Sequence, residues 1–287
     1  MTSRGTTDRS SRLPRLRVAA SAGALVLGLA ACGGTNDVTS TTGSGPSDPV
    51  DPRAAPTETM PALDGDVVVF AAASLTDSFA QIADGFMAVN PGVTVTLNHG
   101  ASSSLAQQIV SGSPADVFAS ASPATLAVVT DAGLSDGEPV VFVRNRLEIA
   151  VPAGNPGRVT GLADFADADL TIALCAEEVP CGAAAVEAFA AAGITPAPDT
   201  LEQDVRAVLT KVELGEVDAA LVYRTDVLVA GGTVEGIAFP ESEEAVNDYP
   251  IVLLAEAPNP DVAQAFMAYV LSDAGIQVLA DAGFDVE

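Results

Sequence analysis

The chain has 287 residues, a formal net charge of −26 and a single histidine. Its length is sufficient for one or two domains with a hydrophobic core. Because no basic patch is present to neutralise phosphates, the composition excludes a typical nucleic-acid-binding protein. The overall electrostatic field repels anions, so any bound anion would have to be held by local dipoles.

The N-terminus has the pattern of an export signal. Arg12, Arg15 and Arg17 directly precede an apolar run at residues 18–31, which is too short to span a bilayer. The run ends in small residues before Cys32, a pattern that resembles a bacterial lipobox. We expect a lipoprotein signal peptide over residues 1–31, with lipidation of Cys32. The alternative is an ordinary signal peptide followed by an incidental cysteine.

Residues 32–64 are rich in Gly, Ser, Thr, Pro and Asp and have no apolar period. This composition predicts a disordered tether, which would hold a folded part away from a membrane. A glycosylated stalk has a similar composition and remains an alternative.

Strands and helices alternate from about residue 66, which predicts an α/β fold with mainly parallel sheets. A strand over 67–73 leads into a helix over 76–89. The apolar residues of that helix are spaced to share one face: Leu75, Phe79, Ile82, Phe86 and Val89. Further elements are expected in the order strand 93–97, helix 103–111, strand 116–119 and helix 123–132.

A longer apolar segment at 139–152 is interpreted as the crossing into a second lobe. The elements expected there are a short helix at 164–165, strand 170–174, helix 183–192, helix 205–212, strand 218–223 and helix 225–230. A strand over 251–255 and one or two helices over 260–281 complete the chain. The predicted lobes are 65–145 with 246–287, and 146–245, with the hinge near 144–152 and 240–250.

Hydroxyl groups occur at the junctions between several strands and helices. Ser74 and Ser102 each follow a strand and open a helix, and Tyr223 ends a strand. Ligands of doubly wound sheets bind at the carboxyl ends of strands, so these residues and the loop near Cys181 would face one cleft between lobes. The simpler alternatives are that the serines only cap helices and that Tyr223 only packs. On pattern alone Val205 is a core residue.

Two cysteines remain besides Cys32, namely Cys175 and Cys181. In an oxidising compartment a disulfide between them is expected. The alternative is a pair of buried thiols. A zinc site is not expected, because His99 is the only histidine and no further cysteine pair exists.

An ordered set of motifs resembles the molybdate-binding proteins of ABC transporters, over residues 65–285. The motifs are AAASLTD at 71–77, GASSSLAQQI at 100–109, PADVFASA at 114–121, RNRLEIAVPAGNP at 144–156, VPCG at 179–182, VRAVLTKVELGEVDAALVY at 205–223 and YPI at 249–251. Each is weak alone, whereas their common order is specific. The resemblance implies a two-lobed, type II periplasmic-binding fold that clamps an anion between its lobes.

The resemblance also implies a ligand set. Ser74 and Ser102 stand at the family's two ligand serines, and Tyr223 would give a phenol hydroxyl. Cys181 and Val205 would each give a backbone N–H. Cys181 departs from the family pattern, which has alanine there; the backbone contact survives this exchange, and a disulfide would fix the shape of the loop.

These groups suit molybdate, or tungstate of nearly equal size. A fully deprotonated tetrahedral dianion offers only acceptors, so hydroxyl and backbone donors at helix N-termini can hold it without Lys or Arg. The expected protein is a monomer without a cofactor, a direct metal ligand or a nucleic-acid partner. It is expected to be lipid-anchored on the outer face of the cytoplasmic membrane and to deliver the anion to an ABC permease and its ATPase.

Three other functions are alternatives. A binder of the same fold could take another oxyanion, such as tungstate or sulfate, or ferric ion. A serine hydrolase would need a base beside Ser74 or Ser102, but His99 and Lys211 are the only candidates and no GxSxG motif is present. A lipoprotein that binds no small ligand is the remaining possibility.

Overall fold

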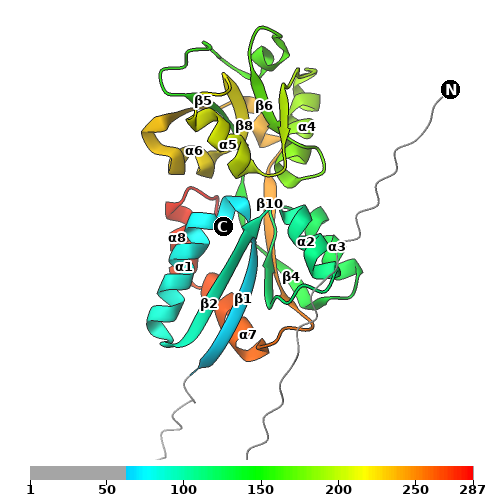
Figure 1. Cartoon of the computed structure of the whole chain (residues 1–287), viewed down its shortest axis with the longest axis vertical. Coiled ribbons are helices and arrows are strands. Elements are labelled where there is room, and N and C mark those ends of the chain that lie inside the picture. Colours follow the sequence, from blue (N-terminus) through cyan, green and yellow to red (C-terminus); the bar gives the residue numbers. More distant parts are fainter. Residues whose placement is uncertain (1–62, 287) are drawn as a thin grey trace, which may run out of the picture. The chain divides into compact units, whose positions relative to one another are not determined.

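The computed structural model describes residues 63–286. The predicted signal peptide (1–31), Cys32 and all but the last two residues of the predicted tether (32–64) lie outside the described residues. The described chain contains two five-stranded sheets, each flanked by helices (Figure 1). The predicted two-lobed α/β fold class is thus confirmed, and each sheet with its helices is called a lobe below.

Lobe 1 is built on a sheet with the strand order β2-β1-β3-β10-β4. β1 pairs in parallel with β2 and β3, whereas β10 pairs antiparallel with β3 and β4. The sheet comprises β1 (Asp64–Ala72), β2 (Gly92–Gly100), β3 (Val117–Ala119), β4 (Ser135–Asn145) and β10 (Asn247–Leu254). The helices of lobe 1 are η1 (Ala73–Leu75), α1 (Thr76–Val89), α2 (Ser102–Val110), α3 (Pro123–Asp131), α7 (Pro260–Val270) and α8 (Asp273–Asp281).

Lobe 2 repeats this pattern with the strand order β7-β6-β8-β5-β9. β6 pairs in parallel with β7 and β8, and β5 pairs antiparallel with β8 and β9. The sheet comprises β5 (Leu147–Pro152), β6 (Ile172–Cys175), β7 (Thr200–Glu202), β8 (Ala219–Tyr223) and β9 (Val234–Ile237). The helices are η2 (Leu162–Ala166), α4 (Pro180–Ala192), α5 (Val205–Glu213), α6 (Arg224–Ala230), η3 (Gly231–Thr233) and η4 (Pro240–Glu243).

Both sheets are mixed, with two parallel and two antiparallel pairings each, rather than mainly parallel as expected. The antiparallel pairings in each sheet involve strands next to the two lobe crossings. β4 runs directly into β5, and β10 follows the return from lobe 2. A strand that leaves or enters a lobe in this way has no crossover helix to make it parallel to its neighbour.

Helix α1 shows how the apolar pattern fixes packing in lobe 1. Four of its five predicted face residues are buried: Leu75, Phe79, Ile82 and Phe86. The ring of Phe86 packs edge-on against Phe266 of α7, with centroids 5.4 Å apart. Val89 is 66 % exposed, so its place on the buried face was predicted wrongly. It is the last residue of the helix, where the chain turns toward β2.

The segment at 139–152 was expected to be one crossing, but it belongs to two strands of different sheets. β4 ends at Asn145 and β5 begins at Leu147, so the chain changes lobe at Arg146. It returns through residues 238–246, which include η4. The first crossing falls within the segment 144–152 predicted as part of the hinge, and the second overlaps the predicted segment 240–250. That the lobes move about these segments, and that their boundaries lie at 145/146 and 245/246, stay predictions.

Among residues 63–286, no single helix is long and apolar enough to cross a membrane. The helices α7 and α8 reach the required length only as a pair bent by 56°. Several of their residues belong to the lobe 1 core, including Phe266, Val270 and Leu279.

Candidate functional site

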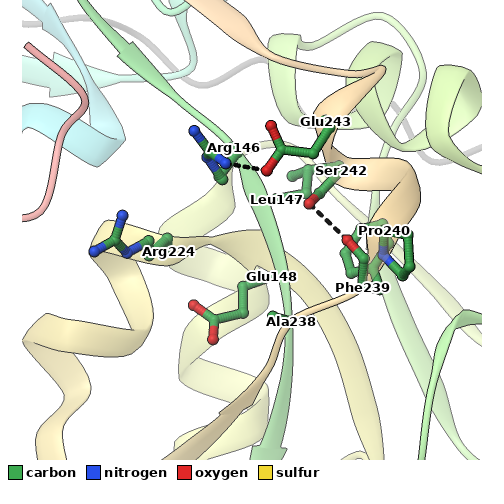
Figure 2. A pocket seen from close by; sticks show the side chains of 9 residues that line it. All are labelled: Arg146, Leu147, Glu148, Arg224, Ala238, Phe239, Pro240, Ser242 and Glu243. Atoms are coloured by element: carbon green, nitrogen blue, oxygen red, sulfur yellow. Dashed lines mark hydrogen bonds and ion pairs between the residues drawn. The ribbon is translucent and has the colours of Figure 1, made fainter.

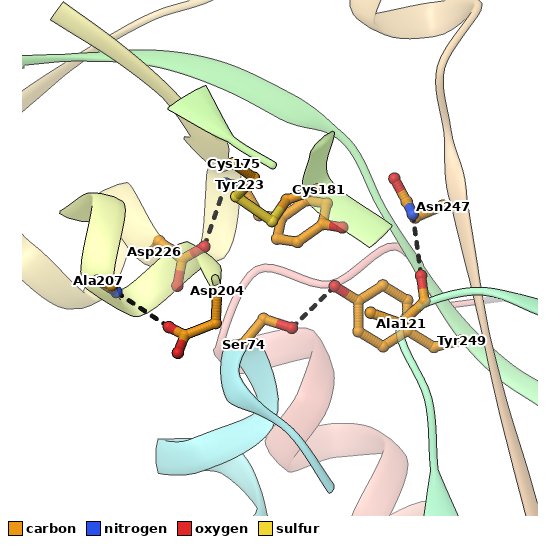
Figure 3. Close-up of a disulfide and its surroundings, with 10 residues drawn as sticks. All are labelled: Ser74, Ala121, Cys175, Cys181, Asp204, Ala207, Tyr223, Asp226, Asn247 and Tyr249. Carbon is orange, nitrogen blue, oxygen red and sulfur yellow. Dashed lines mark hydrogen bonds between the residues drawn. A yellow bond between two sulfur atoms is a disulfide. The ribbon is translucent and has the colours of Figure 1, made fainter. Parts of the chain in front are cut away.

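A small cavity lies between the lobes, where strand ends and helix starts from both of them meet. Its volume of about 20 Å³ is room for a water-sized group or a small ion and far too little for a sugar. All five residues predicted as ligands line it: Ser74, Ser102, Cys181, Val205 and Tyr223. Figure 3 shows Ser74, Cys181 and Tyr223 gathered around this point.

Ser102 is the first residue of α2, and its hydroxyl oxygen already has one hydrogen-bond partner in the protein. The Oγ atom accepts a hydrogen bond from the backbone N–H of Ala121 at 3.0 Å. The carbonyl of Ala121 in turn accepts from the amide of Asn247 at 2.9 Å (Figure 3). Because Ser102 Oγ already accepts one bond within the protein, its own O–H remains to donate to a ligand.

Ser74 lies in η1 and has a tyrosine partner. Its Oγ is 2.9 Å from the hydroxyl of Tyr249 on β10, and either group can donate (Figure 3). When Tyr249 donates, Ser74 keeps its own hydrogen for an acceptor in the cavity. Burial raises the pKa of Tyr249, so its hydroxyl stays protonated at neutral pH.

The helix-capping alternative for the two serines is wrong. No side-chain hydrogen bond caps η1, α1 or α2. The bond that Ser102 makes to Ala121 runs to a neighbouring loop of lobe 1 and not to its own helix. Both hydroxyls are therefore available to the cavity.

Tyr223 presents a buried hydroxyl without a partner among the described residues. Its side chain is 1 % exposed, and the phenol oxygen has no hydrogen bond. Burial raises the pKa of Tyr223 well above its ordinary value, so the group remains a neutral donor. A buried polar atom left unpaired in this way is costly, and a ligand that accepts its hydrogen would remove the cost.

Two backbone donors come from the starts of lobe 2 helices. Cys181 is the second residue of α4 after Pro180, and Val205 is the first residue of α5. N–H groups in a first helical turn lack a carbonyl within the helix, and the helix dipole there favours an anion. These positions match the backbone roles that the resemblance implied.

The loop that carries Cys181 is closed by a disulfide to Cys175 at the end of β6 (Figure 3). Both cysteines are buried. The next residue, Gly182, packs against the backbone of Ala176, where a Cβ would overlap the Ala176 carbonyl oxygen. The disulfide and this close approach together fix the start of α4 against β6.

The lining of the cavity includes no Lys, Arg or His. Its acidic residue is Asp204, whose carboxylate turns away to cap α5 by accepting from the N–H of Ala207 at 2.9 Å (Figure 3). The inner surface thus offers hydroxyl and backbone donors from both lobes. Such a set suits a small anion that needs only donors.

The structure also locates residues that the sequence reasoning missed. Tyr249 and Asn247 support the two serines from β10, which is remote from them in sequence. The YPI motif at 249–251 marked this segment but gave Tyr249 no role in the site. Arg206 does not line the cavity, but it forms ion pairs with Asp77 and Asp226 beside it. Its position next to Val205 was the one sequence feature that could have placed it near the site.

The two bases weighed for a hydrolase are not placed to act. Lys211 pairs with Glu202 and Glu216, at 3.5 Å each, on the far part of α5. His99 is half-buried on β2, and its Nε2 has no hydrogen-bond partner among the described residues. Neither residue lines the cavity that holds Ser74 and Ser102.

A second, larger pocket of about 470 Å³ lies beside the crossings (Figure 2). Arg146 in this pocket pairs with Glu243 and, at 2.7 Å, with Asp285. Arg224 is 3.7 Å from Asp285, and burial raises the pKa of Glu148. Its cations are already matched by acids, so the pocket is less suited to an anion than the small cavity.

In the described chain no cluster of three His, Cys, Asp or Glu side chains could hold a metal ion.

Comparison with known proteins finds relatives over nearly all of the described residues. A family model described as "Bacterial extracellular solute-binding protein" matches residues 67–285. The chain is 39 % identical, over 260 residues, to the molybdate-binding protein ModA of Mycobacterium tuberculosis H37Rv, covering 91 % of this chain and 94 % of that protein.

Two solved structures show the same fold. The periplasmic molybdate-binding protein of Azotobacter vinelandii matches with a TM-score of 0.68 and 19 % identity, covering 77 % of this chain and 99 % of that chain. The sulfate-binding protein SubI of Mycobacterium tuberculosis H37Rv matches with a TM-score of 0.68 and 17 % identity, covering 76 % and 86 %. At such low identity these likenesses establish the fold and not the ligand.

Proposed function

We propose a ligand and a mode of capture from the premise that this chain belongs to the bacterial extracellular solute-binding proteins and, within them, to the molybdate-binding proteins of ABC transporters. The small cavity between the lobes binds molybdate through Ser74, Ser102, Cys181, Val205 and Tyr223. The membership is in a binding family and not in an enzyme family, so we set the serine-hydrolase alternative aside.

The observation that carries the proposal is the unpaired, buried hydroxyl of Tyr223, which lines a cavity rich in donors. Molybdate offers four acceptor oxygens and no hydrogen at neutral pH. Three side-chain hydroxyls from both lobes and two backbone N–H groups of lobe 2 would donate to them. Binding would therefore satisfy the donors and join the lobes in one step.

The expected affinity is reached without any cation in the cavity. Hydrogen bonds to a charged group contribute about 1.5–3 kcal/mol each, so five give on the order of 8–15 kcal/mol before the costs of association. Micromolar binding requires about 8 kcal/mol. Five bonds near the upper end of their range leave this much when association costs are near the lower end of about 4–15 kcal/mol. Donors that are held in place beforehand lower that cost, as when Ala121 holds Ser102 and Tyr249 holds Ser74.

Selection between oxyanions is proposed to depend on cavity size. Sulfate has the same shape and charge as molybdate, but its bonds to oxygen are shorter. In a cavity fixed at the larger radius it would make stretched, weaker hydrogen bonds. Tungstate is nearly the same size as molybdate and is proposed as an equal ligand.

Isothermal titration calorimetry with molybdate, tungstate and sulfate tests the proposal directly. We expect one site per chain, micromolar or tighter Kd for molybdate and tungstate, and at least hundredfold weaker binding of sulfate. Sulfate binding as tight as molybdate would reassign the ligand. Absence of any oxyanion binding would refute the function.

The support that Tyr249 gives to Ser74 leads to a second expectation. Tyr249→Phe keeps the ring, which packs edge-on against Phe284 at 5.4 Å, and removes only the hydroxyl. Loss of one orienting hydrogen bond of about 1 kcal/mol should raise the molybdate Kd about fivefold. Tyr269→Phe, on α7 away from the cavity, is the matched control. Equal Kd values for the two variants would remove Tyr249 from the site.

The proposed location follows from the sequence and the extracellular family. Cleavage before Cys32 and lipidation of its thiol would anchor the chain to the outer face of the cytoplasmic membrane, with residues 32–64 as the tether. The proposed partners are an ABC permease and its ATPase, to which the closed lobes would present the anion. Radiolabelled palmitate incorporation that is lost in Cys32→Ser would support the anchor, and labelling that persists in that variant would contradict it.

A further inference from the structure

Arg206 of lobe 2 forms ion pairs beside the cavity with one acid from each lobe. Its guanidinium forms an ion pair with Asp77 of α1 in lobe 1. The Nε atom lies 3.3 Å from a carboxylate oxygen of Asp226 in α6 of lobe 2. Since Asp77 and Arg206 belong to different lobes, their pairing exists only while the lobes are together.

These three charged residues stand next to the segments that carry proposed ligands. Asp77 follows Ser74 by three residues, Arg206 follows Val205 directly, and Asp226 follows Tyr223 by three. The carboxylate of Asp226 also accepts the backbone N–H of Tyr223 at 3.1 Å (Figure 3). One guanidinium therefore connects three of the five ligand-bearing segments.

The burial of the three groups differs sharply. The side chain of Asp226 is 0 % exposed, that of Arg206 is 25 % exposed and that of Asp77 is 56 % exposed. Burial raises the pKa of Asp226 to about 7, and the nearby Arg206 opposes that rise. Arg206 thus pairs with the buried Asp226 of its own lobe and with the exposed Asp77 of the other lobe.

The pairing with Asp226 bears on anion binding. An ionised Asp226 beside Tyr223 would repel a dianion, and Arg206 is the cation that lies next to this carboxylate. His99 of β2 adds no countercharge, because burial lowers its pKa and leaves it neutral, although Asp77 opposes this shift. Arg206 is therefore the cation that balances the acids at this edge of the cavity.

We propose that Arg206 is a positioning residue for anion capture. Its ion pair with Asp77 stabilises the closed arrangement of the two lobes over the bound anion, and its contact with Asp226 balances the negative charge of that carboxylate beside the anion. The inference rests on the proposed function, since it concerns the same cavity. The ion pair that keeps the lobes together lies outside the ligand set. The lifetime of the complex therefore depends on a group that does not touch the anion.

The two roles of Arg206 can be separated by substitution. Asp77→Asn removes the pairing between lobes and leaves Arg206 with Asp226. Since exposed ion pairs are worth up to about 1 kcal/mol, koff for molybdate should rise about three- to fivefold. Arg206→Gln removes the pairing between the lobes together with the countercharge of Asp226, so it should weaken molybdate binding at least as much as Asp77→Asn does. Arg206→Lys should recover part of this loss.

Stopped-flow measurement of koff for molybdate, at low and high salt, is the test. Asp84→Asn is the matched control, because Asp84 is an exposed acid further along the same helix α1. We expect salt to speed release from the wild type and from Asp84→Asn, and to have less effect on Asp77→Asn, whose ion pair is already absent. The coupling between Asp77→Asn and Arg206→Gln in a double-mutant cycle should be non-zero.

The outcomes distinguish this inference from the proposed function. Molybdate binding by the wild type with identical koff in Asp77→Asn and Asp84→Asn would overturn the role of the Asp77 ion pair while leaving the function intact. An unchanged Kd in Arg206→Gln would overturn the balancing of Asp226. A wild type that binds no molybdate would refute the function itself. Circular dichroism and melting temperature of each variant show whether a loss of binding reflects unfolding.

Discussion

Replacing Ser74 and Ser102 by alanine and Tyr223 by phenylalanine in one chain is expected to abolish molybdate binding. Each change deletes one hydroxyl that the structure places on the cavity wall, and none adds bulk. A hydrogen bond to a charged acceptor contributes about 1.5–3 kcal/mol, so each single variant should bind roughly 10- to 150-fold more weakly. Together the three losses would leave too little free energy to retain the ion.

Calorimetry on the three single variants and on the triple variant measures this series. The control carries the same kinds of change at neighbouring positions outside the small cavity: Ser103→Ala, Ser104→Ala and Tyr269→Phe. We expect the control to bind like the wild type and the folded triple variant to show no heat of binding. Retention of micromolar affinity in the triple variant would show that the anion is held elsewhere.

Removal of the disulfide is expected to weaken both stability and binding. Replacement of Cys175 and Cys181 by alanine opens a short loop, which costs about 2 kcal/mol in the chain-entropy description. In a domain of this size the melting temperature should fall by about 4–8 °C. Because Cys181 lines the cavity, the backbone donor at the start of α4 would lose its fixed position and the molybdate Kd should rise.

Thermal melts with and without molybdate, before and after reduction, test this expectation. A reductant should lower the melting temperature of the wild type toward that of the double alanine variant and leave the variant itself unchanged. Cys32→Ser is the control, because it removes a cysteine outside the disulfide. Equal melting temperatures and equal Kd values for wild type and double variant would mean that the bridge contributes nothing to the site.

Much of the fold could be predicted because local patterns and tertiary packing agree. The apolar face of α1 and the strands around it follow periods that any buried helix or strand must show. Two strands that escaped prediction are β7 (Thr200–Glu202) and β9 (Val234–Ile237). They are short, largely exposed strands, so their sequences lack the apolar signal, and pairing with β6 and β5 defines them instead.

The residues of the candidate site were predicted from family motifs and not from apolar periodicity. Ser74, Ser102, Cys181, Val205 and Tyr223 were identified by the order of several weak motifs and not by composition. The directions of side chains beside them were not predictable. The ion pairs of Arg206 with Asp77 and Asp226, for example, depend on how α5, α1 and α6 approach one another.

The sequence by itself determined the alternation of strands and helices, the absence of a basic binding surface, and the residue types able to donate to an oxyanion. These properties depend on local period, charge and chemistry, which each short segment carries with it. Only the tertiary structure decided which donors share a cavity, that Tyr249 and Ala121 hold the serine hydroxyls, and that Tyr223 is left unpaired. Those features arise from contacts between segments far apart in the chain, and such contacts exist only after both lobes have folded.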